Sequence, residues 1–262
     1  MLRLIRFLRP YVLMILLIFG LLFAQAMADL ALPEAMSGIV NVGLQQKGIA
    51  DAIPEALRTV ELDRLLLLVP AADRAAVDAA YRRLDPEALP AADRDRLLAR
   101  YPILASESVA VWDPPAETDR EALQAVLARA IALRQGLASG MAGFGGMGGT
   151  GGTGGTGGTG GFPSLPAGTD LIEVVEQLPE AQRDALLAKA AEAMAGLSDS
   201  LLLQTASVWI AGEYEACGMD LVAIQNRYIL AQGGYMMLLA LIAAACTIAV
   251  GYLSALVAAG LS

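Results

Sequence analysis

The sequence predicts an all-α membrane protein in which two apolar helices, one near each end of the chain, flank a mostly helical polar region. Residues 228–262 contain no Asp, Glu, Lys or Arg, and residues 11–28 form a second uncharged apolar run. Between these runs, Ala, Leu, Glu, Asp and Arg recur at helical spacing with little alternation of β-branched residues. The chain is 56% hydrophobic with a mean hydropathy of +0.55, which exceeds the usual composition of soluble domains.

The first apolar segment follows three arginines that lie within residues 1–10. A helix of ~20 apolar residues crosses a bilayer core about 30 Å thick, so we expect residues 11–32 to form a membrane-spanning helix. Because cytoplasmic flanks are enriched in Lys and Arg, the N-terminus is predicted in the cytoplasm and the polar region outside it. The small residues at 26–28 also fit a signal peptide cleaved after Ala28, and local sequence alone leaves both interpretations open.

The polar region is predicted to contain several helices. Residues 117–137 form the clearest candidate, because Leu and Ala recur three or four positions apart with Arg and Glu between them. The pattern Pro-x-x-(Asp or Gln)-Arg occurs at residues 70–74, 90–94 and 179–183, each time before a run rich in Ala and Leu. Proline fits the first turn of a helix, where its missing N–H has no partner, so each occurrence predicts a helix start.

A glycine-rich tract at residues 140–162 contains four consecutive Gly-Gly-Thr triplets. Such a segment has too little apolar surface to offset its ordering entropy, so it is predicted to be a disordered linker. It divides the polar region into a first helical part, residues 33–139, and a second, residues 163–227. Residues 146–151 match the dinucleotide-binding pattern G-x-G-x-x-G, but no strand precedes them and any glycine repeat matches equally well.

Composition limits the chemistry that the chain can perform. It has no histidine and only two cysteines, Cys217 and Cys246, which lie too far apart on one continuous helix to form a disulfide. The acidic residues Glu213, Glu215 and Asp220 precede the second apolar segment, and we interpret them as solvated surface rather than a cation site. No catalytic, cofactor-binding or metal-binding residue is predicted, and a net charge of -9 argues against nucleic acid as a partner.

The second membrane-spanning helix is predicted over residues 228–262. Small residues in a membrane helix let another helix approach closely, which makes Gly233, Gly234, Gly251 and Ser254 candidate packing or pathway positions. Asp29, at the outer edge of the first apolar segment, is a fifth candidate, because ionisable groups near membrane depth tend to face protein or water. It also fits an interfacial anchor or a helix cap.

Two segments that flank the polar region resemble a known family. Residues 25–45 read QAMADLALPEAMSGIVNVGLQ, and residues 218–237 read GMDLVAIQNRYILAQGGYMM. Together they resemble the first and second transmembrane helices of bacterial ABC exporters of the multidrug type, in a subgroup with a large extracellular insertion between those helices. The polar region itself resembles no family. The end of the second helix departs from the pattern, because the family more often carries a basic residue near Leu256.

The resemblance implies that the first apolar segment is retained as helix one and that residues 29–43 continue it. The family fold is a six-helix transmembrane domain followed by a nucleotide-binding domain, paired with an identical or different second half. This chain would supply two of the six helices, so it is expected to be an N-terminal fragment that is inactive alone. Its partners would be the lipid bilayer, the remaining helices, the nucleotide-binding domain and the second half.

The resemblance also implies that ATP and Mg²⁺ bind to the missing nucleotide-binding domain rather than to this chain. The complete protein would export drugs, lipids or other small molecules across the bacterial cytoplasmic membrane. Its N-terminus would be cytoplasmic and its insertion extracellular or periplasmic. The alternative is a secreted helical interaction module that loses its signal peptide after Ala28 and is held at the membrane by a C-terminal anchor.

Overall fold

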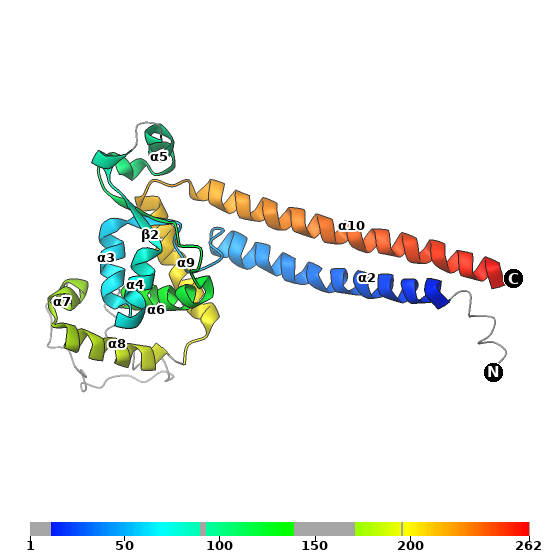
Figure 1. Cartoon of the computed structure of the whole chain (residues 1–262), viewed down its shortest axis with the longest axis horizontal. Helices are drawn as coiled ribbons and strands as arrows, with labels where there is room; N and C mark the ends of the chain where they lie inside the picture. Colours follow the sequence, from blue (N-terminus) through cyan, green and yellow to red (C-terminus); the bar gives the residue numbers. More distant parts are fainter. Residues whose placement is uncertain (1–11, 90–92, 139–170, 195, 262) are drawn as a thin grey trace, which may run out of the picture. The chain divides into compact units, whose positions relative to one another are not determined.

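A computed structural model describes residues 12–89, 93–138, 171–194 and 196–261, which form two compact units (Figure 1). One unit, which we call the helix pair, is formed by the parts of the chain up to Gly48 and from Val222 onward. The other unit, the central domain, comprises Ile49–Leu221. The described residues are mostly helical, as the sequence predicts.

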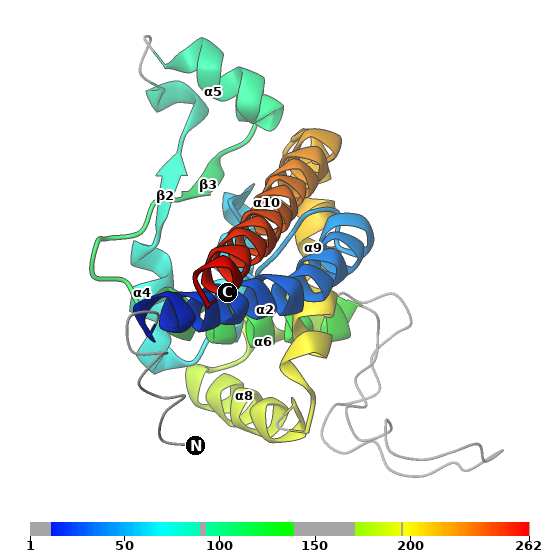
Figure 2. The ribbon, with the colours of Figure 1, turned by 90° about the vertical axis from the view of Figure 1, so that its right-hand side faces the viewer.

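The helix pair consists of two long helical segments. Helix α2 (Val12–Gly38) passes without a break into the π-helix η2 (Ile39–Gln45), and helix α10 spans Leu221–Leu261. Both segments are longer than the predicted membrane-spanning ranges. The first continues past residue 32 to Gln45, and the second begins at Leu221 rather than at residue 228. Figures 1 and 2 show α2 and α10 as single uninterrupted helices.

The segment that follows η2 turns through two residues with left-handed backbone conformation. Lys47 has a φ of 53° and Gly48 a φ of 81°. The amide of Gln46 donates to the carbonyl of Asn41 at 3.1 Å, and the amide of Gly48 donates to that of Val42 at 2.8 Å. A side chain at position 48 would be strained both by this φ and by a backbone atom of Gln225, which lies 2.9 Å from the Cβ site.

The central domain contains a small sheet as well as helices. In chain order its elements are β1 (Ala56–Arg58), α3 (Thr59–Leu68), α4 (Ala71–Ala79), β2 (Tyr81–Leu84), η3 (Pro86–Ala88), α5 (Arg94–Arg100), η4 (Pro102–Ala105), β3 (Val109–Trp112), α6 (Arg120–Ala138), α7 (Leu171–Gln177), α8 (Glu180–Met194) and α9 (Asp199–Ala216).

The sheet corrects the all-α prediction for this region. Its strands are antiparallel in the order β1-β3-β2, with Ala56 opposite Val111 and Tyr81 opposite Trp112. The rings of Tyr81 and Trp112 meet edge to face at 5.3 Å between centroids. Strands of three or four residues are too short to show a period of two in the sequence, and Arg82 and Arg83 break any apolar alternation in β2.

Two of the three proline-based helix starts are confirmed. Helix α4 begins one residue after Pro70 and α8 one residue after Pro179, and each proline carbonyl accepts hydrogen bonds from amides three and four residues further on. Proline therefore stands just before the first turn rather than within it. The third occurrence, at Pro90, lies outside the described residues, and α5 begins at Arg94.

The helix predicted at residues 117–137 is confirmed as α6, which begins at Arg120. Its start is displaced because Thr118 still belongs to a turn, in which its amide donates to the carbonyl of Pro115 at 3.1 Å. The carboxylate of Asp119 then accepts from the amides of Glu121 and Ala122, both at 3.1 Å, and so caps the helix.

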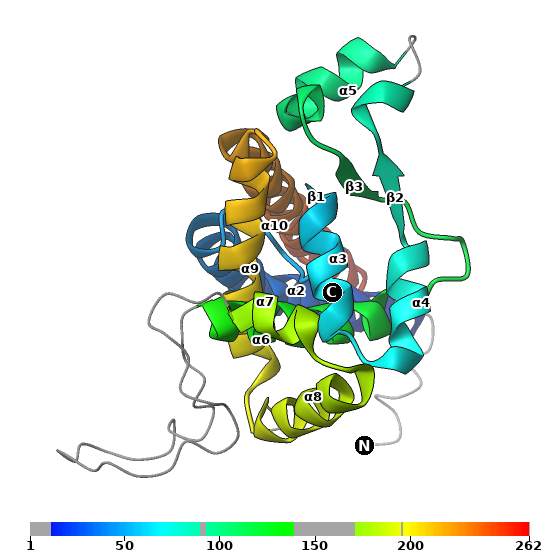
Figure 3. The same cartoon turned by 90° about the vertical axis from the view of Figure 1, so that its left-hand side faces the viewer.

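Helix α6 is the centre of the main hydrophobic core. It contacts α3, α4, α7, α8 and α9, and its residues Leu127 and Ile131 are fully buried. Figure 3 shows α6 among these helices. Because α3 and α4 precede residues 139–170 while α7, α8 and α9 follow them, both helical parts of the sequence contribute to one core. The predicted disordered linker at residues 140–162 falls outside the described residues.

A second, smaller core lies beneath the sheet. It contains the buried residues Ala56, Leu84, Leu89, Tyr101, Leu104, Val109 and Cys217. Leu97 and Leu98 of α5 pack against it from one side, together with Ile103. Figures 2 and 3 show α5 at the end of the ribbon formed by β2 and β3, away from α6 and α8. This core therefore fixes the sheet and the C-terminal end of α9 to each other.

Candidate membrane-spanning pair and buried ion-pair network

In the described parts of the chain, the helix pair carries almost all the exposed large hydrophobic side chains. Val12–Gln45 and Leu221–Ala259 are both long and apolar enough to cross a membrane, and only 6% and 17% of their most apolar stretches are buried. The core helix of a soluble domain would be mostly buried. Among the described residues, every exposed large hydrophobic side chain except Val60 and Val208 belongs to the helix pair.

Polar side chains of α10 bind the backbone of α2 and η2. The Gln225 amide Nε2 donates to the carbonyl of Gly43 at 2.8 Å, and that of Gln232 donates to the carbonyl of Ala35 at 3.5 Å. Residue numbers fall along one segment as they rise along the other, so the two are antiparallel. Such hydrogen bonds between helices stabilise pairs in lipid, where backbone and side-chain groups find no water.

Small residues of α2 and η2 allow this close approach. A Cβ atom at Gly43 would lie 3.0 Å from Cγ1 of Ile229, and one at Gly38 would lie 3.3 Å from Nε2 of Gln232. Ala35 is also buried, at 2% exposure. The predicted packing glycines all lie on the second segment, whereas Gly38 and Gly43 carry the same small-residue signal on the first segment.

The five candidate positions named from the sequence lie elsewhere on the helix pair. A Cβ atom at Gly233, Gly234 or Gly251 would meet no atom of the described residues within 4 Å, the helix's own backbone excepted. Ser254 and Asp29 are exposed. None of these residues mediates the contact between α2 and α10, so their packing against another helix stays a prediction.

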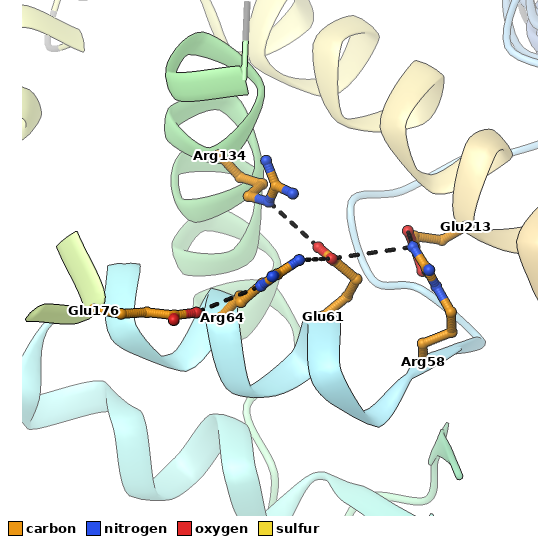
Figure 4. Close-up of polar contacts among 6 residues, drawn as sticks. All are labelled: Arg58, Glu61, Arg64, Arg134, Glu176 and Glu213. Carbon is orange, nitrogen blue, oxygen red and sulfur yellow. Dashed lines mark hydrogen bonds and ion pairs between the residues drawn. The ribbon is translucent and has the colours of Figure 1, made fainter. Parts of the chain in front are cut away.

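The central domain contains two almost fully buried carboxylates, Glu61 and Glu213, and Figure 4 shows them with their arginine partners. Glu213 of α9 is 5% exposed and accepts two hydrogen bonds from Arg58 at the end of β1. Arg58 Nε lies 3.1 Å from Oε2, and Nη2 lies 2.8 Å from Oε1. This bidentate geometry is among the strongest that a carboxylate and a guanidinium form. The hydrogen bonds to Glu213 raise the pKa of Arg58 above its ordinary value.

A second carboxylate, Glu61 of α3, is 3% exposed and accepts hydrogen bonds from two arginines. Arg64 Nη1 lies 2.8 Å from Oε1, and Arg134 Nε of α6 lies 3.3 Å from Oε2. Arg64 also pairs with Glu176 of α7 at 3.4 Å. The hydrogen bond to Glu61 is the main cause that raises the pKa of Arg64.

The network acts as a set of crosslinks between segments far apart in the sequence. It ties α3 to α6 and α7, and it ties β1 to α9, as Figure 4 shows. Each buried carboxylate accepts hydrogen bonds from arginine, which offsets the desolvation of both charges. Among the described residues, no group of three or more His, Cys, Asp or Glu is placed to hold a metal ion.

The interpretation of Glu213 as solvated surface is wrong. Leu202, Ala206 and Ile210 are buried on one face of α9 at a spacing of four, and Glu213, three residues after Ile210, lies on that same face. The helical period was therefore a usable signal. What the sequence could not provide is the partner, because Arg58 lies more than 150 positions away (|i−j| of 155).

The thiol of Cys217 lies beside this network and is fully buried. Burial raises its pKa to about 12 from an ordinary 9.0, and the negative charge of Glu213 acts in the same direction. Burial likewise raises the pKa of Tyr81 and Tyr101. All three groups favour their neutral forms in the folded domain.

We expect iodoacetamide to alkylate Cys217 about a hundred- to a thousandfold more slowly in the folded chain than in urea near pH 8, because only the thiolate reacts. The raised pKa also makes the free energy of unfolding depend on pH. The contribution of Cys217 to stability is fully present below pH 9.0, where the thiol is neutral in both states, and it is lost as the pH rises towards about 12. Mass spectrometry of the modified peptide gives the rate. Equal rates with and without urea would contradict a buried neutral thiol.

Comparison of the chain with known protein families, with curated proteins and with solved structures gave no match. The architecture itself defines a mostly helical protein with two helices long and apolar enough to cross a membrane. Between them in the sequence stands a domain whose helices and small sheet are joined by buried ion pairs.

Proposed function

We propose that this chain is the N-terminal part of the membrane domain of an ATP-driven ABC exporter of the multidrug type, with α2 and α10 as its first two transmembrane helices. The observation that carries the proposal is that the two segments with the family resemblance, residues 25–45 and 218–237, contain the residues that join the helices. Gly43, Gln225 and Gln232 all lie within them.

The geometry of the helix pair supports a pair of membrane crossings. The antiparallel arrangement places the N-terminal end of α2 and the C-terminal end of α10 on the same side, where the arginines within residues 1–10 favour the cytoplasm. The central domain then stands outside. The helical segments have 34 and 39 residues, whereas ~20 cross the hydrocarbon core, so both project beyond it.

In this role the chain supplies part of the wall around a transport pathway. Asp29, Gly233, Gly234, Gly251 and Ser254 lie on exposed or partly exposed surface, where the remaining helices or the second exporter half would pack. ATP and Mg²⁺ would bind to a nucleotide-binding domain encoded further along the same gene. The cargo would be a drug, a lipid or another small molecule moved across the bacterial cytoplasmic membrane.

Expressed alone, the 262-residue chain is expected to sediment with membranes and to show no ATP hydrolysis after purification, because transport by this family requires the nucleotide-binding domain. The decisive measurement is the coding sequence that follows Ser262. Four further apolar spans and then a phosphate-binding loop of the form G-x-x-x-x-G-K-(S or T) are expected. ATPase activity in the isolated chain would contradict the proposal.

The rival function, a secreted interaction module with a C-terminal anchor, is separated by the mass of the mature chain. Helix α2 continues through Ala28 and Asp29, and Ala28 is only 4% exposed, which favours a retained first helix. Intact-mass measurement after expression in bacteria is expected to show residues 1–28 present. A mature chain beginning at Asp29, with a stop codon soon after Ser262, would establish the rival function instead.

A further inference from the structure

We propose that the neck of the central domain is a clamp that keeps two helix ends together: the C-terminal end of η2 and the N-terminal end of α10, called here the outer ends. The neck comprises the two stretches by which the chain enters the domain, Gly48–Arg58, and leaves it, Glu213–Gln225. The proposal rests on contacts within each compact unit and does not depend on the exporter function.

On the domain side, two adjacent residues of α9 hold the entering stretch. Tyr214 Oη accepts a hydrogen bond from the amide of Glu55 at 2.7 Å. Its neighbour Glu213 accepts the two hydrogen bonds from Arg58 described above. Tyr214 is 4% exposed and Glu213 is 5% exposed, so the acceptor of each contact is largely shielded from water. The entering and leaving stretches are therefore fixed to each other inside the domain.

Each stretch is also fixed to the body of the domain. In the entering stretch, Asp51 accepts from Arg120 of α6 at 2.6 Å, and Ala52 and Ile53 are buried. In the leaving stretch, Gly218 adopts a φ of 76° and lies so close to Pro102 that a Cβ atom would be 3.0 Å from that ring. Residues 51–53 of the entering stretch and Gly218 of the leaving stretch are therefore packed against the domain.

On the side of the helix pair, the same two stretches meet again. The Cβ site of Gly48 lies 2.9 Å from Cα of Gln225, and the Gln225 side chain donates to the carbonyl of Gly43. Both units thus bring the entering and leaving stretches into contact independently. Only residues 49–54 and 215–224 separate the two sets of contacts, so these helix ends can part widely only if both sets break.

The test measures the spacing of the outer helix ends in the full chain in lipid nanodiscs. Spin labels are attached to Leu44→Cys and Val222→Cys, which are 57% and 64% exposed, in a Cys217→Ala, Cys246→Ala background. The clamp is opened by Glu213→Gln with Tyr214→Phe, which removes the charge and the acceptor hydroxyl with little change in volume. Asp199→Asn, an exposed carboxylate on the same helix, is the matched control.

With the clamp intact, and in the Asp199→Asn control, we expect one narrow distance peak. With the clamp open, only the contacts within the helix pair hold these ends, so we expect the peak to broaden about the same mean distance while hydrogen exchange in α6 stays slow. A peak that stays narrow in the double variant, with α6 still protected, would overturn the proposal.

A second pair of variants keeps the test decisive if the double variant unfolds. Tyr214→Phe alone removes the hydrogen bond from Glu55 and leaves the Arg58–Glu213 ion pair in place, so the peak should broaden partly. Arg58→Met with Glu213→Leu replaces the ion pair by apolar contacts of similar volume, which should restore a narrow peak. Broadening that is equal in Tyr214→Phe and in the Asp199→Asn control would again overturn the clamp. None of these outcomes depends on ATP hydrolysis or transport.

Discussion

Replacing Glu61 by alanine is expected to lower the free energy of unfolding of the central domain by about 3–5 kcal/mol, the usual cost of removing one partner from a buried ion pair. The Glu61 side chain is 5% exposed and accepts hydrogen bonds from Arg64 and Arg134. Without it, these guanidinium groups and Arg58 would face one another across a cavity. The loss is a large share of the ~5–15 kcal/mol that stabilises a typical domain.

The matched control for Glu61 is Asp63→Ala on the same helix. The Asp63 side chain is 60% exposed and pairs with Arg83, which is itself 42% exposed. An exposed pair of this kind contributes ~0–1 kcal/mol. Urea unfolding followed by circular dichroism measures both variants, and a double-mutant cycle between Glu61 and Arg134 isolates their coupling. Equal losses in Glu61→Ala and Asp63→Ala would contradict a special role for the buried network.

Ile131→Ala in α6 is expected to cost ~2–5 kcal/mol, because the truncated side chain leaves a cavity in a close-packed core. Ile131 is fully buried in the helix that contacts elements from both halves of the domain. The destabilisation should therefore appear at the same time in α3 and in α9. Arg129→Ala, an exposed position on the same helix, should stay within about ±0.5 kcal/mol of the wild type.

Hydrogen exchange with peptide resolution measures this second prediction. In a chain with one shared core, peptides from α3 and from α9 lose protection together and by the same factor in Ile131→Ala. If residues 33–139 and 163–227 formed two independent parts, as the sequence predicts, only peptides of the first part, which contains α3 and α6, would lose protection from exchange. Such a one-sided loss would show that the two parts are stabilised independently.

The features predicted from the sequence are those that depend on neighbouring residues. The two apolar segments are recognisable from composition, and α6 from the spacing of Leu123, Leu127 and Ala130. The starts of α4 and α8 follow from the conformation of Pro70 and Pro179. In each case the physical cause lies within a few positions along the chain, so no knowledge of the fold is needed.

The features that were missed depend on distant residues. Strand β1 is only Ala56–Arg58, and it becomes a strand because β3 lies beside it rather than because of its own propensity. The buried carboxylate of Glu61 is paired with Arg134 on another helix, and the contact between Gly43 and Gln225 joins the two segments that precede and follow the central domain in the sequence. Nothing in the local spacing specifies these partners.

The π-helix η2 has a consequence for how the chain tolerates changes in length. Its hydrogen bonds join residues five apart rather than four, so Ile39–Gln45 holds surplus backbone compared with an α-helix of the same rise. Loss of a single residue there can be absorbed as the wide turns tighten, and the flanking side chains keep their orientation. The same loss in the middle of α2 would rotate every later residue by roughly 100° about the axis. A one-residue deletion in η2 can therefore shorten the α2–η2 segment while the face of α2 that contacts α10 keeps its orientation.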